Sequence, residues 1–117
     1  MAFGAKPTQI GSLTGINAGT SAPTQNDATA GFDTQSQRFV NVWYHLTGGT
    51  SADTTVYLYR TGIGWILYTD VPQLTLTTAN FGGVIQVETR GAERIYVRLQ
   101  NLVGPPTVDV ILESVTY

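Results

Sequence analysis

The side chains best suited to chemistry are one histidine, His45, and eight carboxylates, in a chain that has no cysteine. A catalytic triad requires a base that a carboxylate orients beside an activated hydroxyl, and the sequence around His45 marks neither partner. No Gly-x-Ser-x-Gly motif is present. A single histidine without thiolates also excludes a metal site built from clustered His or Cys ligands. We therefore predict that His45 is structural, that the chain is not an enzyme, and that it holds no metal or cofactor.

The other polar motifs favour surface and turn roles over catalysis. A glycosidase would use paired carboxylates, and Asp109 and Glu113 are candidates. Both alternate with apolar residues along one expected strand, where Arg98 is within reach, which indicates individually weak surface ion pairs. The glycines at 48–49 and 62–64 lack a following Lys-Ser/Thr pair and a helix, so they indicate turns rather than a phosphate-binding loop.

Aromatic side chains on strands are candidates for stacking on sugar rings or unpaired bases, and they are Trp43, Tyr57, Tyr59, Trp65 and Tyr68. Nucleic-acid binding normally needs a cationic groove. Six basic and eight acidic residues leave a net charge of −2, so we predict no nucleic-acid partner. Carbohydrate binding needs no charge and stays open.

These residues must be positioned by a small fold. At 117 residues the chain is long enough for one domain, and only 12% of its residues are charged. The apolar runs are too short to span a membrane, and no secretory signal is visible at the start. We expect no membrane association.

The composition changes near residue 37, which divides the chain into residues 1–36 and a domain at 37–117. Residues 1–36 are mostly small or polar and contain few large apolar groups to offset the loss of backbone entropy. They predict either a frayed terminus or an extended arm that becomes ordered on a protein neighbour. The expected anchors of the arm are Phe3, Lys6, Pro7, Ile10, Leu13 and Ile16. Ile10, Leu13 and Ile16 could also form one short strand or turn within it.

From residue 38 onward, β-branched and aromatic runs alternate with Gly and Pro turns. No window has the apolar period of a helix. Seven strands are expected, at 38–46, 54–60, 63–69, 73–78, 84–89, 94–102 and 107–116. Short strands without intervening helices predict an all-β fold, an antiparallel β-sandwich of jelly-roll-like type with the extended N-terminal arm.

Residues 56–68 predict a β-hairpin with two apolar faces. With a two-residue loop, Thr61-Gly62, Leu58 is expected to pair with Trp65, and the face that carries these two side chains is the expected core face. An open sheet face is normally polar, but the opposite face here is aromatic and aliphatic. Either this face is exposed to water, which tyrosine side chains tolerate, or it is covered by a ligand or a second copy. In the case of a second copy, the interface residues would be Tyr57, Tyr59, Ile66 and Tyr68.

The last two strands have two possible arrangements. If they are neighbours, a four-residue loop sets Leu99 against Val110 and places Arg98 diagonal to Asp109 and Glu113. If the fold is a jelly roll, they lie in opposite sheets and the Pro-Pro link crosses between them. The apolar pattern fits both arrangements.

The arm at 1–36 and the strand series 38–46, 56–68 and 94–117, without cysteine and with little charge, resemble small virion proteins of tailed bacteriophages. The likeness is to trimeric capsid decoration, or cement, proteins in particular. It implies a structural protein that binds the outside of a capsid and clamps capsomer junctions. The implied partner is the major capsid protein, the implied oligomer is a homotrimer, and the implied location is the virion after synthesis in the host cytoplasm.

Receptor-binding heads of phage tails share this style of fold. The alternative is therefore a receptor- or glycan-binding module of a tail fibre or baseplate, with Tyr57, Tyr59 and Trp65 as its candidate contacts.

Overall fold

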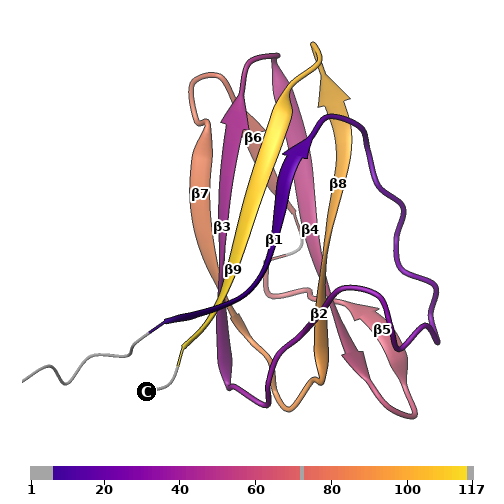
Figure 1. The fold of residues 1–117 in the computed structure, drawn as a ribbon. Helices are drawn as coiled ribbons and strands as arrows, with labels where there is room; N and C mark the ends of the chain where they lie inside the picture. Colours follow the sequence, from indigo (N-terminus) through magenta and orange to yellow (C-terminus); the bar gives the residue numbers. More distant parts are fainter. Residues whose placement is uncertain (1–6, 72, 116–117) are drawn as a thin grey trace, which may run out of the picture.

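The computed structural model describes residues 7–71 and 73–115, which form nine β-strands and no helix (Figure 1). The strands follow the predicted segments closely from residue 38 onward, and two more strands precede them. Their bounds are β1 (Thr8–Ile16), β2 (Phe32–Asp33), β3 (Phe39–Thr47), β4 (Ser51–Arg60), β5 (Gly64–Leu67), β6 (Leu74–Thr77), β7 (Gly82–Glu88), β8 (Arg94–Val103) and β9 (Thr107–Val115). The all-β prediction is confirmed.

The strands form two antiparallel sheets packed face to face. Sheet A has the order β1-β9-β3-β7, and sheet B has the order β2-β8-β4-β5. Strand β6 also pairs with β4, at Ser51–Thr54, whereas β5 pairs with it at Tyr57–Arg60. β5 and β6 therefore act as one interrupted edge strand of sheet B.

The core lies between the sheets and follows the two-residue period of the strands. Along β3, Val40, Val42, Tyr44 and Leu46 are buried, and the residues between them face outward. Strands β4, β8 and β9 contribute inward-facing residues in the same way, among them Val56, Val97 and Leu112. Burial of these aliphatic side chains is the main stabilising contribution.

Strands β8 and β9 lie in opposite sheets, which decides between the two predicted arrangements. Leu99 pairs with Thr54 of β4, and Val110 pairs with Tyr44 of β3. The 104–106 link therefore crosses from one sheet to the other, and Arg98 is not diagonal to the carboxylates of β9.

The β4–β5 hairpin is present, but its predicted register is wrong by one residue. Tyr59 pairs with Trp65 and Leu58 with Ile66, so the loop has three residues, Thr61–Ile63. A shift of one residue moves side chains to the other face of the sheet. Trp65 therefore lies on the outer face of sheet B, whereas the predicted register placed its side chain on the core face.

Residues 8–36 belong to the sandwich, so the predicted boundary at residue 36 does not separate an arm from a domain. β1 pairs with β9 at the edge of sheet A, and β2 pairs with β8 at the edge of sheet B. Ile10, Leu13 and Ile16 are half-buried against the core, as the alternative of a strand within the arm predicted. Pro7 is exposed, and Phe3 and Lys6 lie outside the described residues.

Residues 17–31, here called the connection, run from β1 to β2 across sheet B. Figure 1 shows this segment descending beside β8 and β5. Among the described residues, no helix is long and apolar enough to cross a membrane.

Candidate functional site

His45 and Asp109 of β9 contact residues of neighbouring strands and loops. The His45 ring packs edge-on against Phe81 with centroids 5.6 Å apart, and its Nδ1 is 3.3 Å from the Thr47 hydroxyl. Asp109, opposite His45 in register, accepts a hydrogen bond from the Gly15 N–H at 2.7 Å. No group of three or more potential metal ligands occurs in the part of the chain that the structure describes.

The outer face of sheet B carries a cluster of four aromatic rings. The ring centroids of Tyr59 and Trp65 are 5.4 Å apart, those of Trp65 and Tyr96 are 5.9 Å apart, and those of Tyr57 and Tyr96 are 6.3 Å apart. Trp65 is only 6% exposed and Tyr59 is buried. Three of the five aromatic candidates for ligand stacking therefore pack within this cluster.

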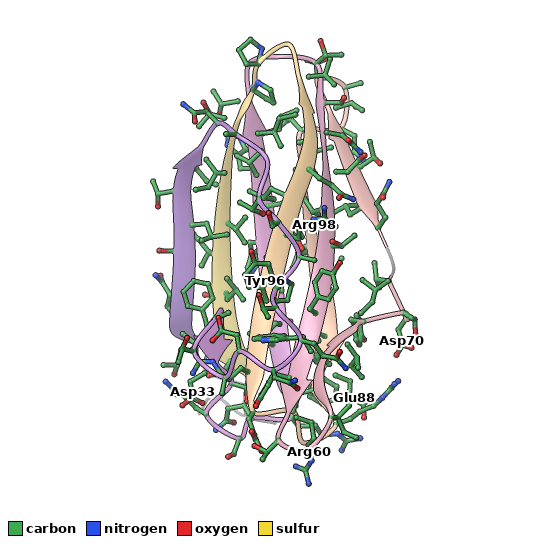
Figure 2. All side chains as sticks on the ribbon, turned by 90° about the vertical axis from the view of Figure 1, so that its right-hand side faces the viewer. Asp33, Arg60, Asp70, Glu88, Tyr96 and Arg98 are labelled. Carbon is green, nitrogen blue, oxygen red and sulfur yellow. The ribbon has the colours of Figure 1, made fainter. Side chains whose placement is uncertain are left out.

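The connection covers this cluster and is held there through its backbone carbonyls. Trp65 Nε1 donates to the Asp27 carbonyl at 2.6 Å, and the Tyr96 hydroxyl donates to the Ser21 carbonyl at 2.7 Å. Arg94 Nε donates to the Ala30 carbonyl at 2.8 Å, and Arg98 Nε to the Thr20 carbonyl at 3.2 Å. Figure 2 shows the connection crossing over Tyr96 and Arg98. The sequence left open whether this face is wet or is covered by a ligand or a second copy, and the structure shows that a segment of the same chain covers the aromatic cluster.

A cavity of about 290 Å³, here called the hairpin pocket, lies where the β4–β5 hairpin meets the loop between β7 and β8. Buried Leu58, Tyr68 and Ala92 are among its lining residues. The remaining lining comes from the β4–β5 hairpin with the residues that follow it, and from Thr89 and Arg90 of the β7–β8 loop.

Three large aliphatic side chains line the pocket from the solvent side. Ile63 is 57% exposed, Ile66 is 53% exposed, and Leu67 is also exposed. A contiguous exposed apolar patch next to a hollow is typical of a binding surface. The hairpin pocket is therefore the best candidate site.

The predicted interface residues are only partly available at this site. Tyr59, Ile66 and Tyr68 all line the hairpin pocket, whereas Tyr57 belongs to the aromatic cluster. Tyr59 and Tyr68 are buried within the single chain and Tyr57 is half-buried, so Ile66 is the most exposed member of the set. Ile63 and Leu67 were not predicted as site residues. In the case of Leu67, the register error placed the side chain on the core face.

Two guanidinium groups also line the hairpin pocket. Arg90 forms an ion pair with Asp70. Arg60 donates to the Gly91 carbonyl at 3.1 Å, and Figure 2 shows its side chain at the lower end of the molecule, pointing away from the sandwich. The pocket is thus apolar inside and cationic at one margin.

A second exposed apolar surface lies on the outer face of sheet A. Trp43 of β3 is 47% exposed and stands directly opposite Val84 of β7 and Ile111 of β9, which are exposed as well. These three residues are here called the sheet A stripe. Trp43 Nε1 donates to Glu113 Oε1 at 2.7 Å. The sequence contains a signal for the stripe, because Ile111 is the apolar residue between two outward-facing acids.

No protein-family model, no curated protein and no solved structure matches the chain. Strand order and surface chemistry therefore support the proposals that follow.

Proposed function

We propose that the domain is a jelly roll. The order β1-β9-β3-β7 in one sheet and β2-β8-β4-β5 in the other supports this assignment. Successive strands from β1 to β4 change sheets at each step, as do those from β7 to β9. With β5 and β6 taken as one interrupted edge strand, each sheet has four strand positions, and two such sheets joined by these crossings are the pattern of two Greek keys wound together.

We propose that the protein is a structural component of a phage virion that binds the outside of the capsid and stabilises capsomer junctions, as a homotrimer. The observation that carries this proposal is the hairpin pocket, where exposed Ile63, Ile66 and Leu67 adjoin an apolar cavity. Such a surface favours docking on another protein, here the major capsid protein. The position of His45 and Asp109, each held by structural contacts, supports a non-catalytic role.

Co-sedimentation with heads of the virus that encodes the chain tests this role. We expect the wild-type protein to pellet with the heads and Ile66→Ser to remain in the supernatant. Val103→Ser is the matched control, because Val103 is equally exposed but lies at the opposite end of the sandwich. If the wild-type protein does not pellet, the capsid role is refuted. Light scattering measures the oligomer in the same samples, and a monomer would exclude the trimer.

Removal of residues 1–6 tests the arm in the same assay. This deletion takes away Phe3 and Lys6 but leaves β1, which begins at Thr8. Loss of head binding would assign attachment to the arm, and retained binding would assign it to the hairpin pocket.

Glycan binding is a second candidate, favoured by the sheet A stripe. Trp43 presents an exposed indole next to Glu113 and Asn41, and Asn41 accepts a hydrogen bond from Gln86. An aromatic surface beside carboxylate and amide groups suits the apolar face and the hydroxyls of a sugar. We expect hexose oligosaccharides to change Trp43 fluorescence, while buried Trp65 stays silent. An unchanged signal across host polysaccharides, or the same change in Trp43→Ala, would refute this function.

A further inference from the structure

The chemistry of the hairpin pocket specifies the kind of segment that it accepts. This inference rests on the proposed docking role of the pocket. The described residues form two ion pairs, Arg38 with Glu88 and Arg90 with Asp70. Arg60 belongs to neither pair, and its guanidinium donates to a neutral carbonyl, that of Gly91. The margin of the pocket therefore carries a cation, Arg60, that takes part in neither ion pair. The net charge of the whole chain is −2.

The interior of the pocket selects for an apolar group. Its lining includes Leu58, Tyr68 and Ala92, all buried, and these side chains offer carbon surface rather than hydrogen-bonding groups, the Tyr68 hydroxyl excepted. That hydroxyl accepts from the Glu88 N–H at 3.4 Å. About 290 Å³ is enough space for one large side chain. Burying such a side chain contributes a factor of roughly 10 to 100 in affinity.

The outer wall of the pocket favours a polypeptide over a small molecule. Ile63, Ile66 and Leu67 remain exposed around the opening, and a ligand confined to the cavity would leave them in water. An extended segment that inserts one side chain would also cover these three residues with its backbone and neighbouring side chains. Binding energy is then gained both inside the pocket and around it.

We propose that the hairpin pocket binds an extended segment of the capsid protein in which a bulky apolar residue is followed by an acidic one. The apolar side chain enters the cavity that Leu58 and Ile66 line, and the carboxylate pairs with Arg60. Charge complementarity at Arg60 fixes the direction of the segment, because the acid must lie on the side of the pocket nearest the hairpin loop.

Blocked tetrapeptides test this assignment without the virus. The probes are acetyl-Gly-Phe-Asp-Gly-amide, its Phe-Lys counterpart and its Ala-Asp counterpart. Amide shifts of the 15N-labelled protein report their binding. We expect the Phe-Asp peptide to shift Ile66, Leu67 and Ala92 in a saturable way. The Phe-Lys peptide should bind about fivefold more weakly, since partly exposed ion pairs are weak. The Ala-Asp peptide should bind at least tenfold more weakly.

Protein variants separate the role of Arg60 from general electrostatics. Arg60→Gln should remove the preference for Phe-Asp over Phe-Lys. Arg38→Gln, which removes an exposed cation that does not line the pocket, should preserve it. Equal binding of the two peptides to the wild-type protein, or shifts outside the pocket, would overturn the proposal. Tighter binding of sodium decanoate at the same amides would also overturn it, by making the pocket a small-amphiphile site. A self-association that Ile66→Ser abolishes would overturn it in favour of a second copy.

The two proposals fail separately. If the wild-type protein prefers the Phe-Asp peptide but pellets with no heads, the pocket chemistry stands and the capsid role fails. If it pellets with heads and Arg60→Glu pellets equally well, the capsid role stands and the acidic partner segment is refuted.

Discussion

The seating of the connection on sheet B can be tested at Gly31, the last residue before β2. Gly31 has φ +68°, and a Cβ added there would overlap the carbonyl oxygen of Ile95 and touch the Trp65 ring. Gly48 has φ +69°, but a Cβ there would meet nothing within 4 Å. The two glycines therefore share the same backbone strain and differ in their neighbours.

Alanine at either position carries the left-handed backbone penalty of about 1–2 kcal/mol. At Gly31 it also forces an overlap with the buried backbone of β8, which adds about 1–3 kcal/mol. We expect Gly31→Ala to lower the free energy of unfolding by about 2–5 kcal/mol and Gly48→Ala by about 1–2 kcal/mol. For a chain of this size, each kcal/mol lowers the Tm by about 4 °C.

Urea titrations followed by circular dichroism, with thermal scans in parallel, measure both variants. The difference between them is the informative quantity, because the shared strain cancels. If the two variants unfold within about 0.5 kcal/mol of each other, residue 31 does not lie against Ile95 in solution. The connection would then be a free arm, and the finding that residues 8–36 belong to the sandwich would be refuted.

Three further predictions follow from the contacts described. Removal of residues 1–36 deletes β1 and β2, so we expect no cooperative unfolding transition in thermal scans of the truncated chain. The buried Tyr44 hydroxyl has no hydrogen-bond partner among the described residues, so Tyr44→Phe should be neutral or stabilise by up to about 1 kcal/mol in urea titration. Burial raises the pKa of Tyr44; wild-type stability should therefore fall as pH rises above the ordinary value of 10.0, and less so in the variant. Hydrogen bonds from the Thr29 hydroxyl and N–H lower the pKa of Asp27 below its ordinary value of 3.8. Their contribution is present above that value and is lost as pH falls through the lowered pKa. Quenching of Trp65 should therefore increase as pH falls in the wild-type protein, toward the level of Asp27→Ala, whose profile should be flatter because it lacks these hydrogen bonds at every pH.

The strands of the domain could be predicted because their apolar alternation is a local property. Residues 38–46 were expected to form a strand, and β3 spans Phe39–Thr47. The register of the β4–β5 hairpin could not be predicted from the loop alone. Gly64 packs against the Gln25 carbonyl, which also accepts the Trp65 N–H at 2.8 Å. A residue about forty positions earlier in the chain thus supports the three-residue loop.

The role of residues 17–31 was hidden for a different reason. Side chains of sheet B bind this segment through its backbone carbonyls, such as those of Ser21 and Ala30. Every residue type has a carbonyl, so the composition of the segment gives no sign of the contact. Trp43 could be selected from the sequence as an exposed aromatic. The hairpin pocket could not, because it is lined by two segments, the β4–β5 hairpin and the β7–β8 loop, that are distant in the chain and meet only in the folded domain.

The pairing of Thr8 with Ser114 has a mechanical consequence. Strand β1 begins at the same end of sheet A where its antiparallel neighbour β9 ends. Tethers attached to the start of β1 and to the end of β9 therefore leave the molecule at the same end. Tension between the two termini would peel β1 from β9 one residue pair at a time, as a zipper opens. The same tension applied along the two strands in shear would load the whole ladder of hydrogen bonds at once. The protein should therefore yield readily to a pull between its own ends.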